Sequence, residues 1–407
     1  MTHSQAASGP PPGFPFIRVA LALSLAAAVS LGITRFAYGL LLPPMRTDLG
    51  WSYALAGAMN TSNAVGYLLG ALLTPVLLRR ASPASILLYG SLSASLLMAA
   101  SGLFTDTAVW LAQRLLAGIA SALVFVTGGL LAARLGATEP QRGGLLIGIY
   151  YGGTGIGICL SALVLPCVMQ LAQGSAHVWA WGWAALALLC LAATALLRWP
   201  VARLAQLARS NGAGVAPPPA AGRMPLGRFG FALAAYAMFG AGYIGYMTFV
   251  VALLREQGQS SAGITAFYFL LGLAVLVSPR LWARLLDRFR DGRPLALLNA
   301  LLGVAALLPA LSDAWPLVFA SGLLFGALFL SVVASTTALV RHNLPPAQWA
   351  AGISAFTIVF AAGQIVGPTV VGWISDGAGG LERGFVVSAL ALWVGAALAL
   401  RQRAVQM

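Results

Sequence analysis

The sequence predicts an all-α polytopic membrane protein with twelve transmembrane helices in two pseudo-symmetric six-helix bundles. Three observations predict this fold. The 407 residues are 60% apolar and only 8% charged, which is far from the composition of soluble globular proteins. Twelve apolar stretches are each long enough to cross a hydrocarbon core about 30 Å thick. One long polar segment separates these stretches into two groups of six.

The elements follow in order from hydropathy. A polar tail covers 1–16, and the first bundle covers 17–200. Its helices are expected at 17–43, 53–78, 84–104, 107–133, 143–170 and 178–198. The segment 201–226 combines arginines with prolines and glycines, which predicts a flexible linker. The second bundle covers 227–403, with helices expected at 228–254, 261–285, 294–312, 315–340, 348–374 and 383–402.

The arginines predict the orientation. In a soluble protein a net charge of +14 would suggest nucleic acid, but here the arginines gather at the ends of apolar stretches. Eighteen lie on the side of the tail and linker, against three on the other side, Arg46, Arg255 and Arg383. The positive-inside rule therefore places both termini in the cytoplasm, and we expect a bacterial inner membrane. The predicted environment is a lipid bilayer, and no nucleic-acid partner is expected.

The two remaining arginines lie inside apolar spans. Arg35, in GITRFAYGLLLPPM from Gly32, is some 12 Å from one face at about 1.5 Å per residue, and Arg114 in the fourth helix has a similar depth. All nine acidic residues fall at helix ends or in loops, so no span offers a carboxylate partner. Two buried like charges are relieved by an anion shared between them, and Arg binds carboxylate in a bidentate fork. Both are therefore candidate substrate ligands.

A structural role is the alternative for each arginine. Either guanidinium could cap helix carbonyls, hydrogen bond to a neighbour such as Gln113, or extend to the outer surface. If Arg114 is structural, Arg35 binds the anion alone.

Other polar and aromatic side chains at mid-depth are predicted to complete the site. Tyr38 follows Arg35 by one turn, on the same face of a regular helix. The other candidates are Asn60 and Asn63 in the second helix, Tyr150 and Tyr151 in the fifth, Tyr243 and Tyr246 in the seventh, and Gln364 in the eleventh. Each alone also fits a role in the core or between helices. Together they would form an aromatic, hydrogen-bonding pocket for a small organic acid with an apolar body.

A weak internal repeat supports two related halves. Tyr38 and Tyr243, like Trp110 and Trp315, are separated by 205 residues. Such duplications are common in secondary transporters, whose substrate site lies near the membrane midplane between the repeats.

Several motifs resemble the major facilitator superfamily. QRLLAGIASALVF from Gln113 is similar to the fourth-helix motif of that superfamily, and GQIVGP from Gly363 is similar to its eleventh-helix pattern. ARLLDRFRDGRP from Ala283 resembles the signature after the eighth helix, which implies that Asp287, Arg288 and Arg293 take part in gating. The first helix, with arginine, phenylalanine, alanine and tyrosine before paired prolines, resembles the YbfB/YjiJ group.

Two positions depart from the superfamily patterns. Thr74 stands where the loop after the second helix usually has an aspartate, which weakens a cytoplasmic gate inferred by analogy for the first half. GGTGIG from Gly152 keeps the glycines of the antiporter motif without its proline, so the motif does not support proton exchange.

The predicted function is secondary active transport of a small organic anion by alternating access around Arg35, by a monomer, with a proton as a further candidate for co-transport. The sequence shows no catalytic constellation, metal site or cofactor motif, so an enzyme is not expected. One alternative is an exporter of amphipathic or drug-like compounds in which Arg35 is structural. Another is a non-transporting membrane sensor or scaffold on the same fold.

Overall fold

The computed structural model describes residues 14–139, 141–210, 225–345 and 348–405, and these contain helices but no β-strand. The first half consists of α1 (Phe16–Ala27), η1 (Ala28–Ile33), α2 (Tyr38–Leu49), α3 (Tyr53–Leu77), α4 (Pro83–Ala100), α5 (Thr107–Thr138), α6 (Gly143–Leu171) and α7 (Val178–Ser210). The second half consists of η2 (Leu226–Phe229), α8 (Gly230–Glu256), α9 (Ser261–Arg288), α10 (Arg293–Leu311), α11 (Trp315–Asn343), α12 (Trp349–Ser375) and α13 (Gly380–Leu400).

The predicted all-α fold is confirmed. The segment Phe16–Leu49, which contains α1, η1 and α2, counts as one span. With it, eleven helical segments of the described chain are long and apolar enough to cross a membrane. The twelfth long helix, α3, is less hydrophobic than these segments because four consecutive polar residues lie in its middle: Asn60, Thr61, Ser62 and Asn63. Its length of 25 residues still suffices to span.

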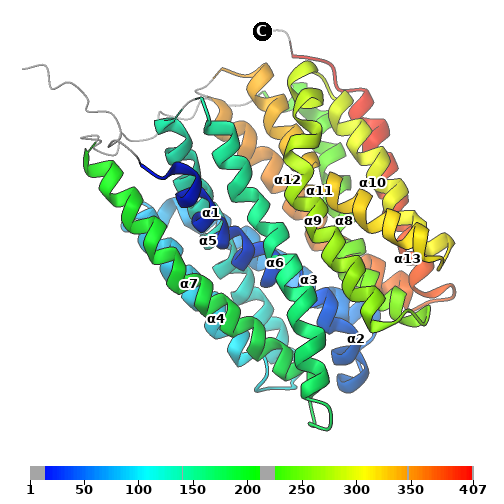
Figure 1. The fold of residues 1–407 in the computed structure, drawn as a ribbon. Helices are drawn as coiled ribbons and strands as arrows, with labels where there is room; N and C mark the ends of the chain where they lie inside the picture. Colours follow the sequence, from blue (N-terminus) through cyan, green and yellow to red (C-terminus); the bar gives the residue numbers. More distant parts are fainter. Residues whose placement is uncertain (1–13, 140, 211–224, 346–347, 406–407) are drawn as a thin grey trace, which may run out of the picture.

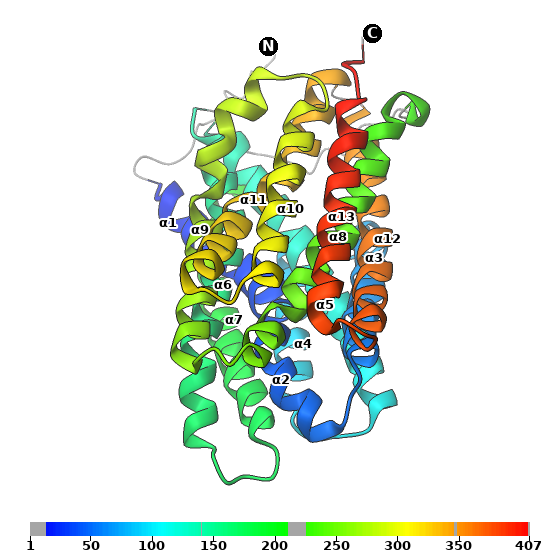
Figure 2. The same cartoon turned by 90° about the vertical axis from the view of Figure 1, so that its right-hand side faces the viewer.

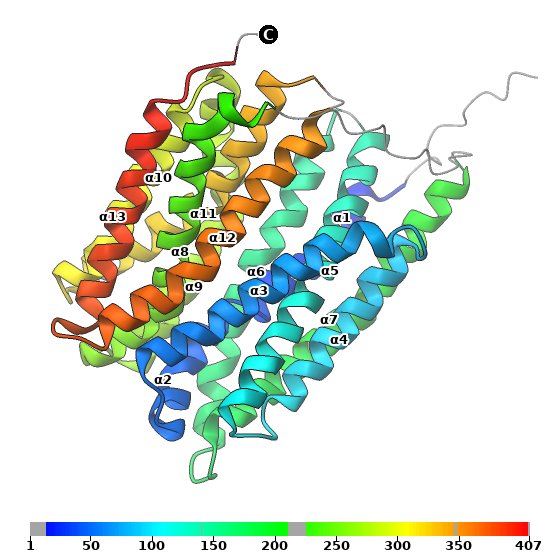
Figure 3. The same cartoon turned by 180° about the vertical axis from the view of Figure 1, so that it is seen from behind.

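The two halves lie side by side (Figure 1). α1 begins and α13 ends at the same end of the molecule, which we call the terminal end, and the loop between α2 and α3 lies at the opposite end (Figure 2). Between the halves, α3 packs against α12, α6 against α9, and α2 against α8. The first of these contacts is seen from behind in Figure 3.

The first span differs from its prediction. A continuous helix was expected over 17–43, but the α-helix gives way to the π-helical η1 and then to turns over 34–37, which we call the helix break. In this region Thr34 N and Phe36 N bond to carbonyls five residues back, those of Val29 and Leu31. The Thr34 hydroxyl also donates to Val29 O at 2.6 Å. This side-chain bond competes with regular helical pairing, which favours the irregular geometry.

The other helix bounds agree with the predictions to within a few residues, except at two helix ends on the side of the terminal end. α5 continues to Thr138 and α7 to Ser210, so α7 includes the first part of the segment predicted as a linker. The rest of that segment, 211–224, and most of the predicted tail, 1–13, lie outside the described residues.

Glycines allow the helix backbones to approach closely. A Cβ atom at Gly118 would collide with the carbonyl oxygen of Asn63, and one at Gly153 with that of Ser24. Between the halves, a Cβ atom at Gly155 would collide with the carbonyl oxygen of Gly272. Small residues drive packing in membranes in this way, because backbones that approach closely gain van der Waals contacts.

At the opposite end the halves are joined by Tyr53, the first residue of α3. Asp376, which follows α12, accepts hydrogen bonds from Tyr53 N at 2.7 Å and Ala54 N at 2.8 Å. A carboxylate at a helix N-terminus satisfies unpaired donors and complements the helix dipole. The Tyr53 hydroxyl also hydrogen bonds to Glu256 of the second half, and the Arg46 guanidinium lies over the Tyr53 ring at 3.8 Å.

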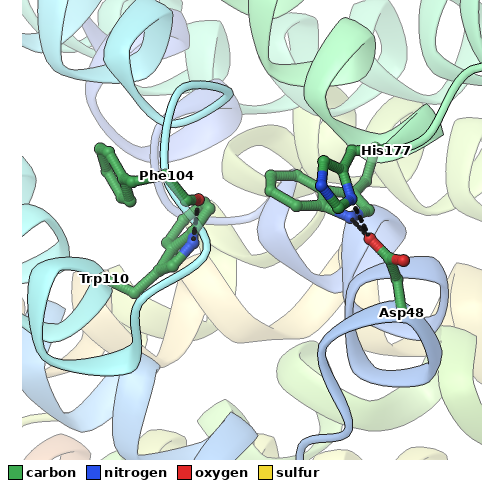
Figure 4. Close-up of polar contacts among 5 residues, drawn as sticks. Asp48, Phe104, Trp110 and His177 are labelled. Atoms are coloured by element: carbon green, nitrogen blue, oxygen red, sulfur yellow. Dashed lines mark hydrogen bonds and ion pairs between the residues drawn. The ribbon is translucent and has the colours of Figure 1, made fainter.

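The first half has its own bracing at this end. His177 Nδ1 lies 2.7 Å from Asp48 Oδ2, and Trp110 Nε1 donates to Phe104 O at 3.1 Å (Figure 4). Trp179 Nε1 donates to the same Asp48 oxygen at 2.5 Å. The two contacts of Asp48 join the end of α2 to the start of α7, so the segment that follows the helix break is held to its own half.

Candidate functional site

The helix break presents backbone carbonyls to side chains from both halves. The Thr34 carbonyl accepts a hydrogen bond from Arg114 Nη1 at 3.2 Å. The Phe36 carbonyl accepts one from the Tyr268 hydroxyl of α9 at 2.7 Å. Non-helical backbone is tolerated at membrane depth only where protein or water satisfies its polar groups. Arg114 and Tyr268 supply that satisfaction, one from each half.

Arg114 is enclosed by its own half. Its side chain has no exposed surface, Nη2 donates to Asn60 Oδ1 at 3.1 Å, and the guanidinium carbon lies 4.9 Å from the centre of the Tyr38 ring. Nε has no hydrogen-bond partner. Asn60 in turn donates to Thr248 Oγ1 of α8 at 2.7 Å. Arg114 is thus held between the break and α3, with a link through Asn60 to the second half.

Arg35 lies between the halves. It is 3% exposed, and its Nη2 donates to Gln364 Oε1 of α12 at 2.6 Å, which is its one hydrogen bond within the described part of the chain. Gln364 Nε2 donates to the Tyr243 hydroxyl of α8. The guanidinium carbon lies 5.4 Å from the centre of the Tyr67 ring of α3, so a cation–π contact supplements the amide.

No carboxylate neutralises either buried arginine. All nine acidic residues lie in described segments, and the ion pairs there are His177 with Asp48 and Arg293 with Asp291, both at helix ends. Arg35 and Arg114 lie close enough to interact electrostatically, and like charges repel. The prediction that they share a depth is confirmed by the bond from Arg114 to the residue before Arg35.

Beside Arg35 the second half forms a wall of nearly parallel rings, which we call the aromatic wall: Tyr236, Phe239, Tyr243, Phe329 and Phe360. Tyr243 is its centre. The Tyr243 ring lies at 19° to Phe239, 9° to Phe329 and 17° to Phe360, with centroids 4.8, 6.1 and 5.5 Å apart. Three helices, α8, α11 and α12, contribute to this surface.

Two tyrosines of the first half lie across from the wall. Tyr67 and Tyr151 are both in electrostatic range of Tyr236, and Phe125 packs against both, at 6.5 and 5.5 Å between centroids. Tyr151 is 38% exposed although it lies near residues of both halves.

The ten residues predicted for the site divide into three groups. Arg35, Tyr243, Gln364 and Tyr151 lie together between the halves. Arg114, Tyr38, Asn60 and Asn63 form a cluster within the first half, where Tyr38 donates to Ala56 O at 2.9 Å and Asn63 to Arg114 O at 3.1 Å. Tyr150 and Tyr246 are buried in the cores of their own halves.

Tyr38 does not accompany Arg35 as predicted, because the helix break intervenes and turns its ring toward Arg114. Tyr150 donates to Phe125 O at 2.7 Å, and Tyr246 stacks on Phe325 at 3.9 Å with its hydroxyl 2.7 Å from Ser321 Oγ. Neither side chain contacts Arg35, which follows from the helix faces on which they lie.

The three predicted gating residues lie at the terminal end, where α9 meets α10. Asp287 and Arg288 are exposed, and Arg293 Nε pairs with Asp291 Oδ2 at 3.3 Å. The described hydrogen bonds between halves all lie from the level of Arg35 to the opposite end. In this conformation the predicted gating residues therefore make no hydrogen bond to the first half within the described chain.

Four residues near the site were not predicted from the sequence: Tyr67, Thr248, Tyr268 and Phe360. Tyr67 had a usable signal, since it follows Asn60 by seven residues and Asn63 by four, and so shares their helix face. Tyr268 and Thr248 had no such signal, because their partners belong to the other half. Tyr268 donates to the Phe36 carbonyl in the helix break, and Thr248 accepts from Asn60.

The fold and the buried polar site between two bundles are those of a major facilitator transporter. Residues 27–400 match the family described as "Uncharacterised MFS-type transporter YbfB", and the chain belongs to this family. This confirms the predicted superfamily and subgroup. A search of curated proteins gave no match.

Solved structures support the same fold. The inward-facing, unoccupied structure of a bacterial homologue of the human lysosomal transporter Spinster aligns with a TM-score of 0.68 and 17% identity, over 96% of this chain and 98% of that one. The nucleoside transporter NupG aligns with a TM-score of 0.69 and 13% identity, over 95% of this chain and 98% of that one. At these identities the similarity shows the fold alone.

Proposed function

We propose that the protein is a secondary active carrier that moves a small organic anion by alternating access, with Arg35 as the anion ligand. The observation that carries the proposal is the environment of Arg35: a permanently charged guanidinium, 3% exposed, between the halves, with one amide partner and no carboxylate. Intramembrane charges are costly and usually mark a substrate or ion pathway.

The arrangement favours an anion because of the charge that it leaves uncompensated. Arg114 is bonded to a carbonyl and an amide, both neutral acceptors, so two positive charges lie near each other without a counter-charge. A carboxylate at Arg35 would relieve this repulsion and form the strong charge-assisted bonds of a bidentate pair. Binding would require Arg35 to exchange its bond with Gln364 for bonds with the substrate.

The other residues take distinct roles in this proposal. Gln364 and Tyr243 hold Arg35 in position when the site is empty and offer hydrogen bonds to the bound anion. Arg114, with Asn60, Asn63 and Tyr38, stabilises the helix break that presents Arg35. Arg114 is then a positioning residue.

The proposed orientation places the terminal end in the cytoplasm of a bacterium, with the protein in the inner membrane. The arginine distribution supports this, since Arg46, Arg255 and Arg383 lie at the ends of helices that meet the opposite end. The described conformation is then inward-facing, closed outside by the Tyr53 contacts. In the outward-facing state, Asp287, Arg288 and Arg293 would face the first half and close the inner side.

The proposed driving force takes account of where the acidic residues lie. Because every Asp and Glu lies at a helix end or in a loop, the proposed driving forces are exchange of one anion for another and a proton carried on the substrate carboxyl group. The motif in α6 gives no support for a proton antiporter.

Counterflow in proteoliposomes tests the proposal. Vesicles loaded with a mixture of small carboxylates should accumulate labelled carboxylate, and Arg35→Gln should abolish this uptake. Arg79→Gln, at an exposed arginine of the terminal end, is the matched control and should transport normally. Uptake that is the same with Arg35→Gln would overturn the role of Arg35.

The apolar aromatic wall supports a second candidate, an exporter of amphipathic compounds in which Arg35 is structural. In that case neutral or cationic lipophilic compounds would exchange in the same vesicles, and small carboxylates would neither exchange nor compete.

A further inference from the structure

We infer that the cargo is a monocarboxylate with a flat aromatic ring, held by Arg35 at its carboxylate and by the aromatic wall along its ring. This inference rests on the proposed function and specifies the substrate class of the same site. Three features carry it: the number of available charges, the parallel rings beside Arg35, and the tyrosines that face those rings.

The charges available to a substrate limit it to one carboxylate. Arg114 directs one terminal nitrogen to Thr34 O and the other to Asn60 Oδ1, so both of its terminal nitrogens already hold a hydrogen bond. Arg35 has one hydrogen bond, to the neutral Gln364 amide, so it can still pair with a carboxylate. One guanidinium matches one carboxylate, and a second carboxylate in this apolar surrounding would remain uncompensated.

The aromatic wall selects a flat body. The rings of Phe329 and Phe360 lie within 17° of the Tyr243 ring, so these rings stack on one another. Phe360 is the partly exposed member of the wall and the others are buried, so a flat ring that packs against Phe360 would continue the same stack. An aromatic ring gains offset-stacking energy on such a surface, and a puckered aliphatic ring of the same size does not.

The wall also fixes the direction in which the ring points. Tyr236 and Phe239 precede Tyr243 on α8, and α8 begins at the terminal end. Tyr236 stacks on Phe360 at 5.0 Å and 20°, which extends the wall from Arg35 toward that end. The substrate would thus have its carboxylate at Arg35 and its ring toward the terminal end.

In this inference, side chains of the first half contact the substrate ring on the side opposite the aromatic wall. The Tyr67 ring lies 5.4 Å from the Arg35 guanidinium carbon, and Tyr151 is 38% exposed. Both are near Tyr236 of the wall. A ring held between Tyr67, Tyr151 and the wall would contact both halves, so its binding would favour their closure at the terminal end.

Four probes of similar size test the inference in counterflow: benzoate, cyclohexanecarboxylate, phthalate and benzamide. Benzoate should exchange, and cyclohexanecarboxylate should have an affinity about 3- to 10-fold weaker, which corresponds to the loss of one aromatic pair. Phthalate, with a second carboxylate, and benzamide, without charge, should not exchange.

A variant of the wall separates stacking from simple hydrophobicity. Phe360→Leu should bring the affinities for benzoate and cyclohexanecarboxylate close together. The matched control is Phe385→Leu, because Phe385 of α13 packs against Tyr246 in the core of the second half, with centroids 5.6 Å apart, and has no ring contact with the aromatic wall in the described chain. It should keep the preference for benzoate even if its stability falls.

The outcomes distinguish the two proposals. Equal affinities for benzoate and cyclohexanecarboxylate, or exchange of phthalate, would overturn the inference and leave the organic-anion carrier intact. Exchange of none of the acids, or exchange that is the same in Arg35→Gln, would overturn the proposed function together with it.

Discussion

Arg35 and Arg114 are two arginines of similar depth with opposite surroundings. Arg114 is bonded to a carbonyl and an amide of its own half and lies against Tyr38 and Trp183. Arg35 reaches across to the other half and has one amide partner. The difference shows that burial alone does not identify a ligand-binding charge. A structural arginine is distinguished by the number of hydrogen bonds that its guanidinium already donates to acceptors of the protein.

The largest expected effect is that of Arg35→Gln on transport. The substitution removes the charge and keeps an amide that can bond to Gln364, so we expect a loss of substrate affinity of about 2–5 kcal/mol, on the order of 30-fold or more. The Tm without substrate should change little, because the guanidinium has a single hydrogen-bond partner. Binding measured by calorimetry, beside the thermal unfolding curve, checks both parts.

For Arg114→Ala we expect the reverse pattern. The change removes the Arg114 donors from the Thr34 carbonyl and from Asn60 Oδ1 and opens a cavity, so it should lower the free energy of unfolding by about 2–5 kcal/mol. Thermal unfolding of the purified protein measures this loss. Arg114→Lys retains the charge and should recover part of it. A fully stable Arg114→Ala carrier that has lost only substrate binding would assign Arg114 to the site and erase the contrast.

Gln364→Glu should give Arg35 a carboxylate partner within the protein. The new carboxylate would lie where Gln364 Oε1 now accepts from Arg35 at 2.6 Å, so it would compete with the substrate. We expect about 10- to 100-fold weaker binding. Gln364→Ala is the control, and its effect should be smaller, about 5-fold, since it removes a hydrogen bond without adding a charge. Transport assays with both variants would show whether charge decides the result.

The smallest expected effect is that of Tyr268→Phe, which removes the bond from the second half to the Phe36 carbonyl. Because Gly39 N still donates to that carbonyl at 3.2 Å, the loss should be about 1 kcal/mol. A Tm shift of a few degrees with unchanged substrate affinity is expected. A loss of affinity comparable with that of Arg35→Gln would mean that the helix break is held in place by the second half.

Much of the architecture was predictable because hydrophobic length is a local property. The spans, the division into halves and the depth of Arg35 and Arg114 all follow from counting residues, and most helix bounds agree. The helix break could not be predicted by counting residues. It depends on the bond of the Thr34 hydroxyl to Val29 and on side chains that arrive from α5 and α9.

The site was predictable in part for the same reason. Polar residues at mid-depth were identified correctly as unusual, but depth does not specify the direction of a side chain around its helix axis. Tyr246 and Tyr243 lie on the same helix, three residues apart, and only Tyr243 reaches Gln364. The aromatic wall combines α8, α11 and α12, and no single segment contains its pattern.

The sequence by itself determined that this chain spans a membrane many times, that it carries two arginines without acidic partners in the spans, and which superfamily it belongs to. Only the tertiary structure decided which arginine is satisfied by the protein, because that depends on acceptors brought from distant helices. Charge and hydropathy are written residue by residue, whereas hydrogen-bond satisfaction exists only between residues that folding brings together.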